Sequence, residues 1–230
     1  MSKQGTIHLV VGYAGTGKDT LCHMIQQGYT LAPKEFPGSW WRIYAPPGTN
    51  APRFGRVTRV AFADALKEEV VRQIGLPNRN SSLNAEPIWP QYEKQKNTLR
   101  IKNDAGQMVT LRQHYIDYGQ RKKLEDPQYW CKVALDPYKD QKIELFSTDT
   151  RFPVEVKYAR ETFEFAPTYR VFRANVGIAK PVPVEDPEHS LDTFQTDYLL
   201  VPTGEDFEVA VKLFPQYKDY VCRWFIGPNQ

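Results

Sequence analysis

Hydrophobic positions along the chain follow two alternating periods. Five short segments are rich in β-branched and aromatic residues and are bounded by glycine or polar residues, a pattern typical of strands. Between these segments, apolar residues recur every three or four positions, as Leu21, Met24 and Ile25 do, and this spacing predicts helices. Because strands that alternate with helices favour parallel pairing, we predict an α/β fold with a doubly wound, five-stranded parallel sheet and helices on both faces. The predicted strands are residues 7–11, 56–62, 142–147, 169–173 and 197–201.

Two stretches of the chain have no clear period. Residues 33–56 contain five prolines and two tryptophans, which predicts an insertion or a long ordered loop packed by its own aromatic residues. Residues 77–107 are polar and rich in Asn, Gln and Lys, and we expect a mobile flap there. No internal repeat or shift in composition marks a boundary, so we predict a single domain over residues 1–230.

The amino-acid composition argues against several kinds of binding partner and against a membrane location. The 230 residues include 30 basic and 27 acidic side chains, a net charge of only +3, so no nucleic-acid partner is expected and any bound anion needs a local site. The three cysteines form no C-x-x-C pair, which argues against a zinc site or a disulfide framework and favours a reducing compartment. No apolar run reaches the roughly 18 residues of a membrane span, and the first one is too short for a signal peptide. We therefore predict a cytoplasmic protein without a membrane partner.

A glycine-rich loop follows the first predicted strand and precedes the first predicted helix. Its sequence from Gly12 to Lys18 fits G-x-x-x-x-G-K, in which glycines let backbone N–H groups point at phosphate oxygens and the lysine reaches the β- and γ-phosphates. The N-terminus of the following helix adds partial positive charge. The ordinary alternative is a turn with a solvated lysine, but the strand-loop-helix context favours an ATP-binding P-loop. Its predicted ATP-binding residues are Gly12, Ala14, Gly15, Thr16, Gly17, Lys18, Asp19 and Thr20.

The loop departs from the usual pattern at one position. Asp19 stands where a Ser or Thr usually follows the lysine and holds Mg²⁺, and the hydroxyl comes one residue later, at Thr20. A carboxylate is also a hard oxygen ligand, so we predict that Asp19 holds the metal directly or through water. The alternative is that Asp19 is simply an acidic residue favoured by the helix dipole.

Further blocks along the chain, in the same order, resemble one family. The tetrapeptide Gly-Lys-Asp-Thr at residues 17–20 is shared by the phage-type deoxynucleoside monophosphate kinases, a branch of the P-loop nucleoside monophosphate kinase superfamily. The remaining blocks are similar to that family's second-strand block, its acceptor helix, its strand-end motif and the stretch before its last strand. These blocks are residues 62–67, 112–119 with 129–130, 149–151 with 155, and 189–192 with 197–198.

The resemblance implies roles for residues outside the loop. It implies a helical acceptor-binding or lid region over residues 77–125. Lys18, Asp149 and Arg151 would be the catalytic residues, and Arg173 would lie near the donor nucleotide. The implied acceptor-binding residues are Lys67, Arg112, Gly119, Trp130, Asp149, Arg151 and Glu155.

Some of these positions depart from the family pattern or have ordinary interpretations. The glutamine usual in the acceptor helix is replaced near Ile116, and the asparagine usual after the last strand appears as Pro202, which weakens any statement on base specificity. On its own, Lys67 would be a surface lysine, Trp130 a core residue and Arg173 a solvated arginine. No general base is expected, because a phosphate acceptor is already ionised at neutral pH.

The resemblance implies that the protein transfers the γ-phosphate of ATP, with Mg²⁺ as cofactor, to a (deoxy)nucleoside monophosphate. It also implies a place in deoxynucleotide biosynthesis and, for a viral protein, the host cytoplasm. Two alternatives remain: a P-loop kinase of another metabolite, similar to those of phosphomevalonate or dephospho-coenzyme A, and a catalytically silent nucleotide-binding protein. The aromatic residues Trp40, Trp41 and Tyr44 would fill a local core, cover the acceptor or form the face of a homodimer.

Overall fold

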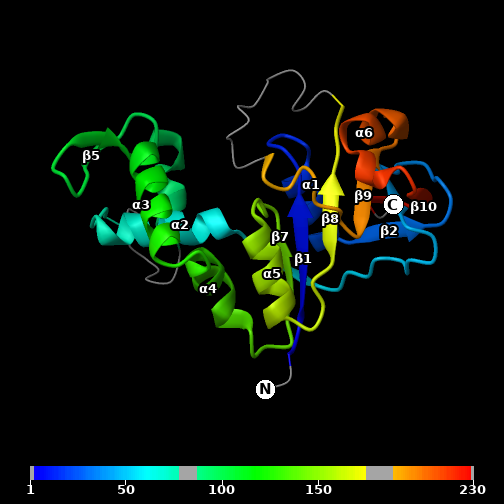
Figure 1. Cartoon of the computed structure of the whole chain (residues 1–230), viewed down its shortest axis with the longest axis horizontal. Coiled ribbons are helices and arrows are strands. Elements are labelled where there is room, and N and C mark those ends of the chain that lie inside the picture. Colours follow the sequence, from blue (N-terminus) through cyan, green and yellow to red (C-terminus); the bar gives the residue numbers. More distant parts are fainter. Residues whose placement is uncertain (1–2, 78–86, 175–188, 229–230) are drawn as a thin grey trace. The chain divides into compact units, whose positions relative to one another are not determined.

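The structure is a computed structural model of the chain and describes residues 3–77, 87–174 and 189–228. The chain divides into two compact units, shown in Figure 1. The first unit contains residues 1–60 and 137–230, and the second contains residues 61–136. The single domain predicted over residues 1–230 stays a prediction.

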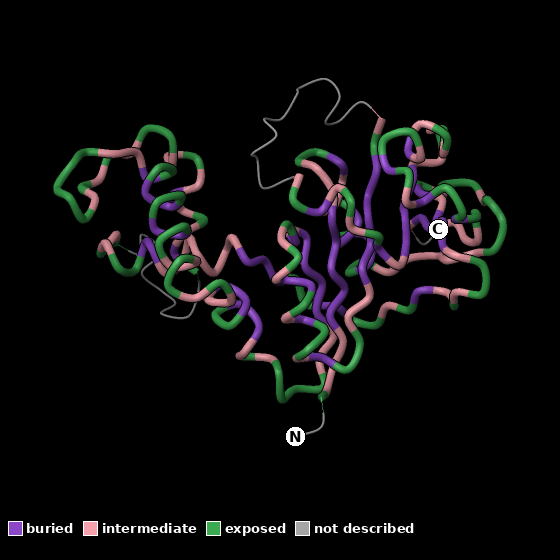
Figure 2. Tube along the Cα trace, in the orientation of Figure 1, coloured by how far each residue is buried: buried purple, intermediate pink, exposed green. Residues whose placement is uncertain are grey.

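The first unit is built on one mixed sheet of eight strands. Their order across the sheet is β2-β10-β3-β9-β8-β1-β7-β4, so β1 lies between β7 and β8 (Figure 1). Burial is concentrated in these strands, while the connecting loops are mostly exposed (Figure 2). The strands are β1 (Thr6–Val11), β2 (Tyr29–Ala32), β3 (Trp41–Ala45), β4 (Val57–Val60), β7 (Glu144–Ser147), β8 (Thr168–Val171), β9 (Tyr198–Pro202) and β10 (Val221–Pro228).

The predicted five-stranded parallel sheet is wrong. The five predicted strands are present as β4, β7, β1, β8 and β9, and these five pair with one another in parallel. However, β3 pairs with β9 in antiparallel orientation, and β10 and β2 continue the sheet in the same antiparallel way. The local sequence pattern does not reveal these three strands. For example, β3 lies inside the segment 33–56, whose prolines are typical of an insertion or loop.

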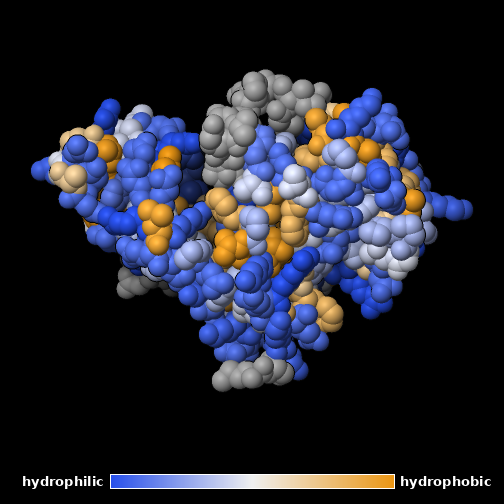
Figure 3. All heavy atoms as spheres, viewed as in Figure 1, coloured by the Kyte–Doolittle hydropathy of each residue, from blue (hydrophilic) through white to orange (hydrophobic). Residues whose placement is uncertain are grey.

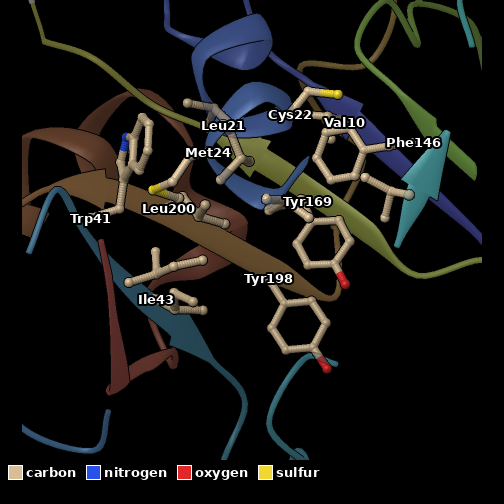
Figure 4. Close-up of a cluster of buried hydrophobic side chains, with 14 of the residues drawn as sticks. Val10, Leu21, Cys22, Met24, Trp41, Ile43, Phe146, Tyr169, Tyr198 and Leu200 are labelled. Carbon is tan, nitrogen blue, oxygen red and sulfur yellow. The ribbon is translucent and has the colours of Figure 1, made fainter. Parts of the chain in front are cut away.

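Helices and aromatic residues complete the core of the first unit. Leu21, Cys22 and Met24 of α1 meet Trp41 and other side chains of the sheet in one buried cluster (Figure 4). Trp41 is therefore a core residue of the first unit. The helices of this unit are α1 (Lys18–Gln26), α5 (Pro153–Thr162) and α6 (Phe207–Leu213), with short 3₁₀ helices η2 (Asp136–Tyr138) and η4 (Pro215–Tyr217).

The second unit is mainly helical and has its own core of aromatic and aliphatic side chains. Near that core, the hydroxyls of Tyr118 and Tyr129 both donate to Oε1 of Glu69, at 2.6 and 2.8 Å. The predicted acceptor or lid region, residues 77–125, falls within this unit, although its residues 78–86 lie outside the described part. The elements are α2 (Phe62–Gln73), η1 (Trp89–Gln95), the hairpin of β5 (Arg100–Lys102) and β6 (Met108–Thr110), α3 (Leu111–Glu125) and α4 (Tyr129–Leu135).

Hydrophilic residues cover most of the visible face of both units (Figure 3). In the first unit, hydrophobic residues gather where Figure 1 places α5. Among the described residues, no helix has an apolar stretch long enough to cross a membrane.

Candidate functional site

The glycine-rich loop joins the end of β1 to the start of α1, as the sequence predicts. Gly12, Gly15 and Gly17 have φ values of 150°, 83° and 98°, a region that side chains rarely adopt. A Cβ atom at Gly12 would lie 2.6 Å from the carbonyl oxygen of Val171. In the described part of the chain, the amides of Gly15 and Gly17 donate to no acceptor. The loop therefore offers backbone donors in a conformation that requires glycine.

Lys18, the first residue of α1, turns back over this loop. Its Nζ donates to the carbonyl oxygens of Gly12, at 2.6 Å, and Tyr13, at 2.7 Å. The hydroxyl of the buried Thr16 also donates to Tyr13, at 2.9 Å. These bonds hold the ammonium group inside the curve of the loop, where an anion bound to the loop amides would be close to it.

The parallel strands bring other predicted residues to the same edge of the sheet. β7 and β8 flank β1 in parallel, so the segments that follow all three strands lie at the carboxyl edge. Asp149, after β7, is half-buried, and its Oδ1 accepts a hydrogen bond from the Ser147 hydroxyl at 3.4 Å. Arg151, after β7, and Arg173, after β8, are exposed, and neither guanidinium has a partner among the described residues. This edge combines a phosphate-type loop with a carboxylate and two available cations.

A cavity of about 380 Å³ opens beside the loop. Arg173 and the loop residues Gly12, Tyr13 and Thr16 contribute to its wall. A hydrogen-bonded group also lines it: the Tyr13 hydroxyl donates to Oδ2 of Asp192 at 2.7 Å, and Nδ1 of His189 lies 2.6 Å from the same oxygen. The volume is at the lower end of the range of small-molecule sites.

The buried Arg170 is part of this wall. Its Nε donates to the Tyr217 hydroxyl at 2.9 Å, and its NH1 lies 3.9 Å from Oδ1 of Asp192. Because Arg170 is only 2% exposed, these partners compensate a buried charge. The sequence analysis gives Arg170 no role because it belongs to no motif. Asp192 lies in the block 189–192 that resembles the family, but no role in the site was predicted for it.

Asp19, the predicted metal ligand, pairs with an arginine from another strand. Nε of Arg59, on β4, lies 3.6 Å from Oδ1 of Asp19. Asp19 and Thr20 are exposed in the first turn of α1. No cluster of three or more His, Cys, Asp or Glu side chains suited to a metal occurs in the described ranges. The oxygen donors of Asp19 and Thr20 still fit Mg²⁺, because this ion is usually held by one or two carboxylates together with the phosphates of a substrate.

Glu155, predicted as an acceptor-binding residue, has a structural role at the start of α5. Its Oε2 accepts hydrogen bonds from the backbone N–H groups of Arg151, at 2.6 Å, and Phe152, at 3.0 Å. Phe152 is the N-cap of α5 and Pro153 its first residue, so Glu155 caps the helix from the third position. The buried carboxylate thereby fixes the backbone that carries Arg151.

The remaining acceptor residues lie in the second unit. Nζ of Lys67, on α2, lies 3.3 Å from Oε2 of Glu93 and 4.1 Å from the centre of the Trp89 ring. Burial raises the pKa of Glu93, but the hydrogen bond from Lys96 and the charge of Lys67 outweigh this effect and hold it below its ordinary value.

Arg112, Gly119 and Trp130 differ in exposure. Arg112, in the first turn of α3, is exposed, and its guanidinium has no partner within the described ranges. Gly119 is buried against Leu66, whose Cδ2 would be 3.1 Å from an added Cβ. Trp130 is 4% exposed and its Nε1 donates to the Gly119 carbonyl at 3.2 Å. Of the residues assigned to the acceptor in this unit, Arg112 is the one available to a ligand in this structure.

A larger cavity, of about 780 Å³, lies elsewhere in the first unit. Thr6, Pro167 and Tyr198, at or next to the amino ends of β1, β8 and β9, line it. No residue of the predicted site lines this cavity. The larger cavity is therefore not the candidate site, which we assign to the glycine-rich loop and the smaller cavity beside it.

Two comparisons of the sequence with known proteins found no match. No protein-family model matches the sequence, and no curated protein matches it significantly. The candidate site is therefore interpreted from its own residues and from the resemblance of its motifs.

Proposed function

We propose that the protein is an ATP-dependent phosphotransferase that phosphorylates (deoxy)nucleoside monophosphates. The observation that carries the proposal is the position of Lys18: it closes a loop of glycines with positive φ at the carboxyl end of a central parallel strand. Asp149, Arg151 and Arg173 follow the two neighbouring strands at that edge.

This set of groups suits phosphoryl transfer. The reaction needs little covalent chemistry; it needs aligned phosphates and neutralisation of the charge on the transferred group. The loop amides and Lys18 would hold the β- and γ-phosphates, and Arg151 would stabilise the moving group, since guanidinium forms bidentate contacts with phosphate. Mg²⁺, when bound with ATP, would neutralise part of the phosphate charge, and Thr20 and Asp149 supply oxygen donors at this edge.

The acceptor side of the proposal rests on the resemblance. Arg112 would bind the monophosphate, and Lys67 would assist after release from Glu93. Trp130, which resembles the family's aromatic at the acceptor, packs in the core of the second unit. A homodimer and a cytoplasmic location remain predictions.

The test is a coupled assay of ADP release with ATP, Mg²⁺ and each nucleoside monophosphate in turn. We expect turnover with at least one of them, and a fall of about 10²-fold or more in Lys18→Ala, because this charge acts on the transferred group. Lys157→Ala, an exposed lysine of α5, is the matched control and should retain full activity. Absence of turnover with every acceptor would refute the proposal.

A second candidate, a nucleotide-binding protein without catalysis, is favoured by one observation. The Asp19 carboxylate pairs with Arg59, so the position that usually holds the metal carries an ion pair. Tight ATP binding without transfer to any acceptor would support this alternative.

A further inference from the structure

Arg59 and Asp19 form an ion pair beside the glycine-rich loop, although 40 residues separate them in the sequence. Asp19 directly follows Lys18 in the first turn of α1. Arg59 lies on β4, where the strand pairs in parallel with β7. Nε of Arg59 and Oδ1 of Asp19 are 3.6 Å apart, and the two side chains are 41% and 79% exposed.

The guanidinium of Arg59 would be repelled electrostatically at this position if no anionic group lay beside it. The N-terminus of a helix carries partial positive charge, which repels a cation placed near its first turn. Asp19 is the acidic residue of that turn and offsets this repulsion. The thiol of Cys22, one turn further along α1, is close enough to be affected by both charges. Burial raises the pKa of this thiol to about 11, the charge of Arg59 acts to lower that pKa, and the charge of Asp19 acts to raise it. The arginine is therefore held close to the start of α1.

A cation held there has a direct use in phosphate binding. The loop and the start of α1 are where an anion would bind, and a guanidinium can form two hydrogen bonds with one phosphate. An exposed ion pair at 3.6 Å is weak, so the contact with Asp19 does not prevent the guanidinium from binding a phosphate as well. The carboxylate would then hold the arginine in position.

We propose that Arg59 is a phosphate-binding residue of the glycine-rich loop and that Asp19 is the positioning residue that holds it there, in place of a metal-ligating role. This inference rests on the proposed function, because it assumes that the loop binds a nucleotide. It also changes the interpretation of the sequence: the aspartate that replaces the usual Ser or Thr is explained by an arginine on a different strand.

The two roles for Asp19 predict different results for the variants Asp19→Asn, Arg59→Ala and the double variant. The first readout is the dissociation constant of a fluorescent N-methylanthraniloyl ATP in excess EDTA. If Asp19 acts through Arg59, each single variant weakens binding by about fivefold to tenfold, and the double variant is no weaker than Arg59→Ala. Arg56→Ala, an exposed arginine three residues earlier, is the control and should bind like wild type.

The second readout is the Mg²⁺ concentration that gives half-maximal tightening of nucleotide binding. It should be the same in Asp19→Asn as in wild type. The proposal is overturned if Asp19→Asn raises this concentration several-fold, or if Arg59→Ala binds nucleotide without Mg²⁺ as tightly as wild type.

These outcomes separate the inference from the proposed function. Wild-type protein that binds the nucleotide, shows the expected coupling and transfers no phosphate would support the inference and refute the kinase proposal. Wild-type protein that does not bind the nucleotide at all would overturn both. Far-UV circular dichroism of each variant checks that these exposed substitutions leave the fold intact.

Discussion

Replacing Glu155 by alanine should destabilise the start of α5 and displace Arg151. Glu155 is 5% exposed, and its Oε2 accepts two backbone hydrogen bonds, from Arg151 at 2.6 Å and from Phe152 at 3.0 Å. A hydrogen bond to a charged group contributes about 1.5–3 kcal/mol, and loss of an N-terminal cap costs about 0.5–2 kcal/mol. Since water can partly replace the acceptor at a helix end, we expect Glu155→Ala to lower the free energy of unfolding by about 2–4 kcal/mol.

The assay is urea unfolding followed by far-UV circular dichroism, together with hydrogen exchange of the Arg151 and Phe152 amides. Both amides should lose protection in the variant. Glu161→Ala is the matched control on the same helix: its Oε1 is 3.9 Å from Nζ of Lys157 in an exposed pair, so its loss should cost about 0.3–0.5 kcal/mol. A Glu155→Ala variant that is no less stable than Glu161→Ala, with both amides still protected, would refute the assignment of Glu155 as a cap.

A second substitution at this position, Glu155→Gln, separates the capping role from recognition of the acceptor base. If Glu155 acts by holding the backbone of Arg151, then Glu155→Gln should lower the transfer rate by a similar factor for every accepted nucleotide. A change in the ratio of rates between nucleotides would show instead that Glu155 contacts the base.

Three further predictions follow from single positions in the first unit. Gly12→Ala should abolish nucleotide binding and lower the Tm, because the added Cβ would lie 2.6 Å from a backbone carbonyl oxygen at a φ of 150°; binding and melting measurements check both effects. The hydrogen bond from His8 holds the pKa of Glu144 below its ordinary value of 4.5, so its carboxylate stabilises the fold above about pH 4.5 and this stabilisation is lost as the pH falls through the lowered pKa. The difference in free energy of unfolding between wild type and Glu144→Gln should therefore be constant above that pH and shrink below it, and a difference unchanged down to pH 3 would contradict this. At pH 8, Ellman's reagent should modify the exposed Cys222 at least about tenfold faster than Cys22, which is buried and has a pKa of about 11; mass spectrometry identifies the labelled thiol, and equal rates would be inconsistent with this burial.

The parallel part of the sheet was predictable because each of its strands has a local pattern. The apolar run at residues 7–11 ends at a glycine, and the strand at residues 56–62 follows one. Polar residues flank the strand at residues 142–147, and Thr196 and Pro202 flank the strand at residues 197–201. The antiparallel part was not predictable in this way. Trp41–Ala45 and Val221–Pro228 pair with each other across 180 residues, and the first lies among prolines that are typical of loops.

In the candidate site, too, residues of one local motif could be predicted and residues brought in from other strands could not. Gly12 to Lys18 are contiguous, and their spacing predicts the loop between β1 and α1. Arg59 belongs to no motif, and only the position of β4 in the sheet brings it to Asp19. Glu155 was predicted as a site residue, but its cap became visible only with the backbone of α5 in place. Local chemistry was therefore accessible from the sequence, while partners from other strands were not.

Phosphorus-31 NMR of the protein with ATP, Mg²⁺ and a mixture of nucleoside monophosphates tests the proposed transfer most directly. We expect the γ-phosphate signal of ATP to disappear while ADP and a second nucleoside diphosphate appear in equal amounts, and we expect Lys18→Ala to leave the spectrum unchanged over the same time. Formation of ADP with inorganic phosphate alone, or no change with the wild-type protein, would contradict the account.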